Sequence, residues 1–396
     1  MLATNLRDIA SNARLQKNFD KSAKCFENAL LIYNKLVQSK EYYRKYIAAV
    51  NMNCSNLWFD KGDNLKAIQL CSEAVNIYVD LIKKNNTAFE GNYLKAVYSL
   101  GNFYFWAEQF DSAVQVLKKV VIDQEKRVKA YPQQYEIDLE RALNTLAVTY
   151  WKQKNYETAE KTFKKAVDLH KILLNPRTPQ YKLEICKTNF NLGAMYQQQK
   201  KLELAENQYI KAADARREAA EKQPNVYGTN HQVTLQCLVN LYDSMRLNEQ
   251  DERKIKVWND YQTKYRNEMV ALQIKIIDAY EKAAVNGKHP KLNEAYGQLA
   301  TYYLSIDKIK EAEVAAKKQD TNKADFLVFL YAIQGKYKEA EGVLMGINDK
   351  KASKIQCSEW ADVYYFQKII SENTRTKINK WLENVQIGRA SCRERV

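Results

Sequence analysis

The stretch LGNFYFWAEQFDSAVQVLKKV, residues 100–120, contains the pattern that decides the fold of this chain. Its Tyr104 belongs to a column that recurs every 46 residues, made of Trp58, Tyr104, Tyr150, Tyr196 and Tyr242. A small-residue column follows the same step, as Ala67, Ala113, Ala159 and Ala205. We therefore expect one supersecondary unit to be stacked many times, each copy burying its apolar face on the next.

Within one copy the apolar residues follow helical spacing. Val97, Leu100 and Tyr104 lie on one face of a predicted first helix, and Gly101 on that face allows the partner helix to approach closely. A second helix is expected to begin at Phe110 and to end before Pro132, since proline disfavours a helical residue ahead of it. The residues predicted to form the repeat core are Trp58, Leu100, Gly101, Tyr104, Ala113, Leu146, Tyr150, Ala159, Phe163, Leu192, Gly193, Tyr196, Ala205, Tyr209 and Tyr242.

The order of these residues resembles the tetratricopeptide repeat. It stands as LAVTY (146–150) with YETAEKTFKKA (156–166), and as LGAMY (192–196) with LELAENQYIKA (202–212). The usual repeat has about 34 residues, whereas the period here is 46, which is similar to the long repeats of the kinesin light chain type. The resemblance implies an all-α, right-handed superhelical solenoid of helix-turn-helix repeats.

Changes in the repeat period divide the chain into segments. We expect a divergent first unit at 1–44, a regular array at 45–247, an irregular charged segment at 248–289, compact units at 290–350 and C-terminal helices at 351–386. The charged segment is expected to form one long helix or two, and the C-terminal helices a cap or a truncated repeat. The tail IGRASCRERV, residues 387–396, resembles translated sequencing-adapter sequence. We therefore expect a non-native tail, and native sequence that continues beyond Gln386 or begins before Met1.

Composition narrows the class of protein. With 46% apolar residues, only 11 Gly and 5 Pro, the chain suits long helices. No apolar run approaches the roughly 18 residues of a membrane span. Seven cysteines without a CxxC pair indicate a reducing compartment, so we expect a cytoplasmic protein. The full sequence has a net charge of +15; the tail accounts for +2 of it, and the remaining +13 is spread along the chain, which favours acidic partners over specific nucleic-acid binding.

Motifs for catalysis are missing from the sequence. There is no P-loop, nucleophile elbow, HExxH motif or cluster with metal-ligand spacing. The sequence therefore predicts a protein that is not an enzyme and that uses no cofactor or metal.

Candidate binding residues follow from the resemblance, which implies a concave groove lined mainly by the first helix of each unit. Lys95, Arg141 and Lys187 occupy groove positions 46 residues apart. Amides at or near groove positions are Asn56, Asn102, Asn144, Asn191 and Asn240. Amides bond any peptide backbone, while cations select acidic side chains or a terminal carboxylate. The carboxylate clamp of chaperone-binding members is disfavoured, because only Asn102 and Lys187 match its pattern.

The sequence thus predicts a non-enzymatic protein–protein interaction scaffold that binds a peptide or protein segment in the groove. Two alternatives stay open. The repeats could be the sensing or docking part of a larger regulator or enzyme whose effector domain lies beyond Gln386. They could also form a homo-oligomeric structural protein that associates with itself.

Overall fold

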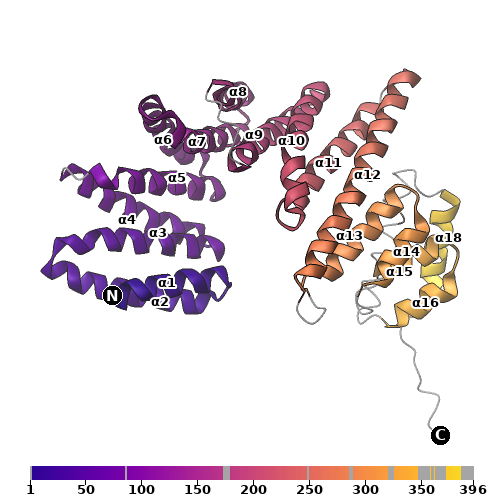
Figure 1. The fold of residues 1–396 in the computed structure, drawn as a ribbon, viewed down its shortest axis with the longest axis horizontal. Coiled ribbons are helices and arrows are strands. Elements are labelled where there is room, and N and C mark those ends of the chain that lie inside the picture. Colours follow the sequence, from indigo (N-terminus) through magenta and orange to yellow (C-terminus); the bar gives the residue numbers. More distant parts are fainter. Residues whose placement is uncertain are drawn as a thin grey trace, which may run out of the picture. The chain divides into compact units, whose positions relative to one another are not determined.

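All the secondary structure is helical in the part of the chain that the structure, a computed structural model, describes. That part comprises residues 2–84, 87–172, 179–247, 249–284, 289–319, 325–346, 357, 361 and 372–384. Contacts between residues divide the chain into two compact units, 1–199 and 200–396. Figure 1 labels their helices along the chain. The predicted all-α fold of helix-turn-helix repeats is confirmed.

The first unit consists of successive helices that pack against one another. Its helices are α1 (Leu2–Leu15), α2 (Phe19–Ser39), α3 (Arg44–Asp60), α4 (Asn64–Lys83), α5 (Glu90–Trp106), α6 (Phe110–Ala130), α7 (Pro132–Lys152), α8 (Tyr156–Ile172) and α9 (Pro179–Gln198). Single 3₁₀ turns, η1 (Glu41–Tyr43) and η2 (Thr87–Phe89), precede α3 and α5. Successive helices pack side by side, as the lower part of this unit shows clearly in Figure 1.

The turn inside each repeat begins at the aromatic column. The carbonyl oxygens of Trp58, Tyr104 and Tyr150 each accept a hydrogen bond, 2.9 Å long, from the backbone N–H five residues later. The residue before that N–H is left-handed, with φ of +84° at Gly62, +59° at Glu108 and +61° at Lys154. These are the features of a Schellman C-cap, in which a left-handed residue ends the helix. The same backbone conformation recurs at Lys17, Lys200, Asp307 and Gly335.

The small-residue columns lie in the core of the first unit. Ala113 and Ala159 have no exposed surface, and neither do Leu117 and Phe163, which follow them by one helical turn. A Cβ atom added to Gly101 would lie 2.7 Å from Leu117 Cδ2, so α5 and α6 touch where the glycine stands. Buried with them are Leu100, Leu146, Tyr150, Leu192, Gly193 and Tyr196, while Trp58 and Tyr104 are half-buried.

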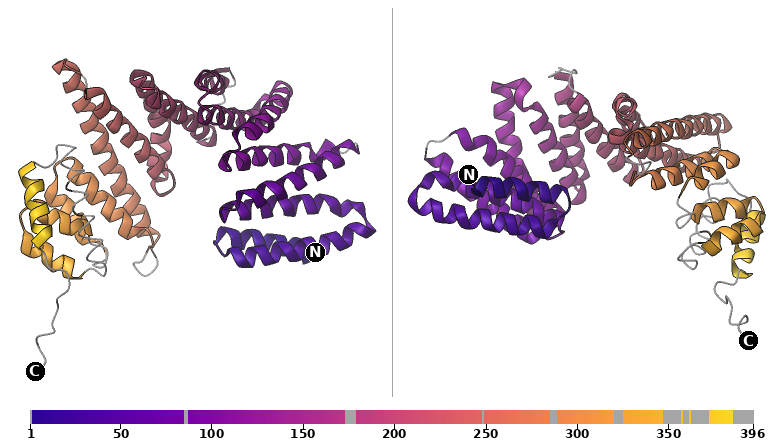
Figure 2. Two further views of the ribbon diagram at one scale, coloured as in Figure 1. Left: turned by 180° about the vertical axis from the view of Figure 1, so that it is seen from behind. Right: turned by 60° about the horizontal axis from the view of Figure 1, so that its bottom comes forward.

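The second unit begins with longer helices and ends with shorter ones. Its helices are α10 (Leu202–Lys222), α11 (Pro224–Arg246), α12 (Glu252–Lys282), α13 (Leu292–Ser305), α14 (Ile309–Lys317), α15 (Asp325–Ile333), α16 (Tyr337–Gly346) and α18 (Glu372–Asn384). The charged segment forms one helix of 31 residues, α12, which lies along α11 in both views of Figure 2. It begins here because the Asp251 side chain accepts the Arg253 N–H at 2.9 Å and caps the helix.

The core of the second unit is continuous from α12 to α18. Ala205, Tyr209 and Tyr242, three of the predicted core residues, are buried in this unit. Further along, Trp381 of α18 donates a hydrogen bond from Nε1 to Glu341 Oε1 at 3.1 Å and packs against the ring of Tyr337. Trp360, Tyr364 and other aromatic residues of 351–371 lie outside the described residues, as does the tail 387–396. The predicted segment boundaries stay predictions.

A search of the described helices finds none with the length and the apolar character needed to cross a bilayer.

Candidate functional site

A pocket of about 580 Å³ lies in the first unit between α5, α6 and α7. Lys95 and Tyr98 of α5, Gln124 and Arg127 of α6, and Arg141 of α7 contribute to its lining. Two of these, Lys95 and Arg141, are predicted groove residues, and the helix pairing brings them to one hollow although they are 46 positions apart in sequence. This volume suits a few side chains of a ligand.

Positive charge dominates the lining. Three cations, Lys95, Arg127 and Arg141, face a single carboxylate, Asp138. Lys95 is exposed and has no ion-pair or hydrogen-bond partner among the described residues. Arg127 donates from Nη2 to Glu90 Oε2 at 2.7 Å, and its guanidinium carbon lies 5.2 Å from the centre of the Tyr135 ring. The pocket therefore offers one unpaired ammonium group beside guanidinium groups that are held in place.

Gln124 adds a buried amide to this pocket. Its side chain is only 5% exposed, and its Oε1 atom has no hydrogen-bond partner within the described protein. Leaving such an acceptor without a partner costs about 1–3 kcal/mol. Whichever way the amide is turned, it presents one donor group and one acceptor. The Oε1 atom is buried, so a peptide N–H reaches it once the Gln124 side chain turns toward the pocket, and a peptide bond then carries the complementary donor and acceptor.

Arg141 and Lys187 share one acidic partner. Glu184 is buried and accepts hydrogen bonds from Arg141 Nη2 at 2.8 Å and from Lys187 Nζ at 3.1 Å. Burial opposes the charge of Glu184, but these two hydrogen bonds outweigh it and lower the pKa of this carboxyl below its usual value. Glu184 thus neutralises much of the charge of two predicted groove cations and leaves Lys95 as the free one.

A second carboxyl, Glu140, lies next to this pair. It is 1% exposed, accepts a hydrogen bond from the Thr188 hydroxyl, and its Oε2 atom has no partner among the described residues. Burial raises the pKa of Glu140 to about 7; the Thr188 hydrogen bond opposes this change, and the charge of Glu184 adds to it. Glu140 therefore titrates close to neutral pH.

The predicted asparagines do not gather in one place. Asn56 and Asn102 each donate to a carbonyl four residues earlier in their own helix, at 3.1 Å. Asn191 donates to Asn144 at 3.0 Å, which joins α9 to α7. Asn240 is exposed in the second unit, where Gln236 donates to it at 2.8 Å. Asn144 and Asn191 lie about one helical turn after Arg141 and Lys187, whereas Asn102 lies about two turns after Lys95 on α5.

Sequence reasoning missed Gln124 and Arg127, because it assigned the groove to the first helix of each unit and both lie on a second helix. A signal was present: they stand three residues apart on α6, with Val120 one turn before Gln124, on one helical face. Among the residues that the structure describes, no cluster of three or more His, Cys, Asp or Glu side chains is placed to hold a metal ion.

Comparisons with known proteins agree with this architecture. A family model described as tetratricopeptide repeat matches residues 140–180 and 191–225. No curated protein sequence matches the chain.

Solved structures with similar folds include nearly identical TPR-like repeats from a Podosopora anserina chain described as a kinesin light chain. The two sequences are 17% identical, the match covers 56% of this chain and 96% of that chain, and the TM-score is 0.44. BtubC (BKLC) from P. vanneervenii has 17% identity, coverage of 69% and 94%, and a TM-score of 0.47. The apo form of RapI has 12% identity, coverage of 80% and 100%, and a TM-score of 0.47. At these identities and scores, the likeness concerns the helical repeat architecture alone.

Proposed function

Because this chain contains tetratricopeptide repeats, we propose that it is a non-enzymatic scaffold that binds an extended segment of a partner protein in the pocket between α5, α6 and α7. The observation that supports this most strongly is the combination of Gln124 and Lys95 in one pocket. A buried amide with an unsatisfied oxygen recognises peptide backbone, and an unpaired ammonium group recognises a carboxylate.

The charges around the pocket define the preferred ligand. Arg127 and Arg141 are paired with Glu90 and Glu184, so the free ammonium group of Lys95 is the charge that favours a segment carrying Asp, Glu or a terminal carboxylate. The rings of Tyr98 and Tyr135 offer apolar surface beside these charges. Backbone contacts would give affinity with little regard to sequence, and the cations would select the acidic segment.

A selection experiment followed by titration tests this proposal. Random 12-residue peptides displayed on phage are selected on the full chain, and an enriched peptide is titrated by fluorescence anisotropy. We expect enrichment of acidic peptides and a loss of affinity of about tenfold or more in Lys95→Glu, since a charge-assisted hydrogen bond contributes about 1.5–3 kcal/mol. Gln124→Met, which keeps the shape but removes the amide, should weaken all enriched peptides alike.

Lys119→Glu is the matched control, because Lys119 is an exposed lysine of α6 outside the pocket lining and its reversal changes the net charge equally. Equal losses in Lys95→Glu and Lys119→Glu would show only long-range electrostatic attraction and would contradict a site in this pocket. Enrichment of peptides without acidic residues would contradict the proposed selectivity.

A further inference from the structure

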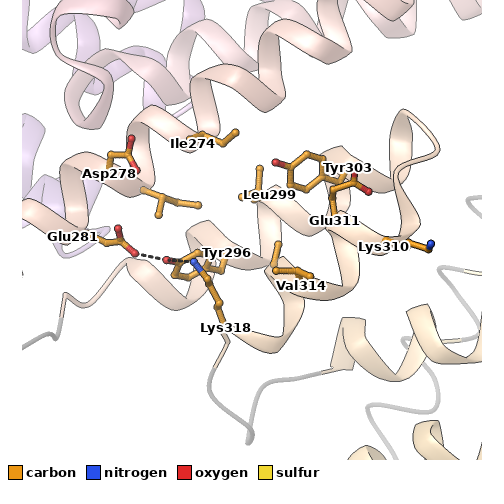
Figure 3. A pocket seen from close by; sticks show the side chains of 12 residues that line it. Ile274, Asp278, Glu281, Tyr296, Leu299, Tyr303, Lys310, Glu311, Val314 and Lys318 are labelled. Carbon is orange, nitrogen blue, oxygen red and sulfur yellow. Dashed lines mark hydrogen bonds between the residues drawn. The ribbon is translucent and has the colours of Figure 1, made fainter.

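A second hollow, of about 400 Å³, lies in the second unit over α13 (Figure 3). Helix α13 packs against both α12 and α14 and forms the floor. Tyr296, Leu299 and Tyr303 rise from this floor at helical spacing. We call this hollow the α13 groove. It belongs to a different unit from the pocket between α5, α6 and α7, so a ligand can bind here whether or not that pocket captures a peptide.

The walls of the α13 groove are also helical stripes. From α12 the residues Ile274, Ile277, Asp278 and Glu281 face the groove, at spacings of three and four. From the opposite side α14 contributes Val314, with Lys310 and Glu311, whose opposite charges balance. Helix α14 has only 9 residues, whereas α6, the second helix of a regular repeat, has 21. The groove thus has a helical floor and two helical walls, and a fourth helix can complete it.

Apolar side chains in the α13 groove face solvent. Val314 is 61% exposed and Ile274 38% exposed, on opposite walls, and Leu299 is buried between them. Two facing apolar walls with an apolar floor form the type of site that holds the apolar face of an amphipathic helix. A hollow of about 400 Å³ has room for a few side chains, which is what the apolar ridge of a single helix presents.

Charged side chains of the α13 groove determine which way round a bound helix lies. At one end a chain of hydrogen bonds crosses the groove: Lys318 donates to the Tyr296 hydroxyl at 3.4 Å, and this hydroxyl donates to Glu281. One turn earlier on α12, Asp278 is exposed and has no hydrogen-bond or ion-pair partner among the described residues. Figure 3 shows Asp278 and Glu281 together on the α12 side of the groove. This wall is acidic, and its outer carboxylate is available.

We propose that the α13 groove binds an amphipathic helix of a partner protein, with its apolar face on Leu299 and Val314 and a Lys or Arg on its flank beside Asp278. The apolar contact supplies most of the affinity, because an exposed ion pair contributes little. The Asp278 contact fixes which flank faces α12 and so sets the orientation of the helix. A helix with acidic residues on that flank meets repulsion and binds less tightly.

Two designed peptides serve as probes on the full chain. Both are 18-residue amphipathic helices with leucine at every third or fourth position; one carries lysine on a single flank and its twin carries glutamate there. We expect the lysine peptide to bind more tightly. Val314→Asp should weaken it about tenfold by removing an apolar contact and adding a charge. Asp278→Lys should reverse the preference between the two peptides: the affinity for the lysine peptide should fall by about two- to fivefold, and that for the glutamate peptide should rise by about the same factor.

Val233→Asp is the control, since Val233 is a 48% exposed valine of α11 that does not line the groove. Val314 is itself mostly exposed, so its substitution leaves the core intact. Failure of the lysine peptide to bind, or binding unchanged by Val314→Asp, would overturn the proposal. A dimer in light scattering that Val314→Asp dissociates would also overturn it, because the occupant would then be a second copy of the chain.

Discussion

The buried carboxyl of Glu140 makes the stability of the first unit dependent on pH. Its pKa is raised to about 7 from an ordinary value of 4.5, so the folded chain holds a proton that the unfolded chain releases between these two pH values. The free energy of unfolding that this group contributes is therefore greatest below pH 4.5 and falls as the pH rises through 7. A difference of two to three pKa units corresponds to about 3 kcal/mol.

Replacing Glu140 by glutamine imitates the protonated state. The amide keeps an acceptor for the Thr188 hydroxyl and carries no charge at any pH. At pH 8 we expect Glu140→Gln to be more stable than the wild type by up to about 3 kcal/mol, and at pH 4.5 the two should be similar. Urea unfolding followed by circular dichroism, with both proteins at each pH, measures this difference while the contributions of other groups cancel.

Two results would refute this reasoning. If the stability difference between Glu140→Gln and the wild type were the same at both pH values, Glu140 would not titrate in this range. If the variant were the less stable protein at pH 8, the carboxylate would be stabilised by its surroundings, which would contradict the dominance of burial over the Thr188 hydrogen bond.

Three further predictions concern other parts of the fold. Burial opposes the charge of Glu268, but hydrogen bonds from His231 and Arg217 outweigh it and lower the pKa of Glu268 to about 2. Glu268→Gln should therefore lower the free energy of unfolding, measured in urea near neutral pH, by about 2–3 kcal/mol. This difference from the wild type should shrink as the pH falls from 4.5 towards 2. Lys154 has a φ of +61°, so Lys154→Gly should raise the stability of the first unit by about 0.5–1 kcal/mol, and a lower melting temperature would contradict the Schellman turn. Ala159 has no exposed surface, so Ala159→Trp should overpack the contact between α7 and α8 and cost about 1–3 kcal/mol; an unchanged melting temperature would remove this residue from the core.

The repeat architecture could be predicted because the core columns are made of residues whose size matters. Gly101 permits the contact between α5 and α6, and Ala113 and Ala159 are fully buried, so few other residues fit there. The left-handed turn residues could not be found in the same way, since Glu108 and Lys154 are neither glycine nor asparagine. The position of the aromatic column indicates where these left-handed residues lie, because the turn donates a backbone hydrogen bond to the carbonyl oxygen of the aromatic residue.

The candidate site could be predicted in part. The 46-residue step identified Lys95 and Arg141, which line one pocket, because equivalent positions on neighbouring repeats lie side by side. It could not reveal that Glu184 pairs with both Arg141 and Lys187, since that contact depends on the side chain one turn before Lys187. Nor could it find Gln124, which lies on a different helix and has no partner in the repeat pattern.

The α13 groove was outside the reach of sequence reasoning for another reason. It depends on the short α14, and helix lengths in 290–350 cannot be read from a period that has changed. The irregular segment, expected as one helix or two, is a single helix whose Asp251 cap stands in the small-residue column.

The most direct test of the binding account is to locate a bound peptide on the chain. A photo-reactive p-benzoylphenylalanine is placed at Tyr135, which lines the pocket between α5, α6 and α7, and in a second protein at Tyr42, an exposed tyrosine of the same unit outside that lining. An acidic peptide selected on the chain should cross-link to the Tyr135 variant, and at peptide concentrations below its Kd, Lys95→Glu should lower the yield of this product about tenfold. Equal cross-linking at Tyr42, or a yield at Tyr135 that Lys95→Glu leaves unchanged, would contradict peptide capture in this pocket.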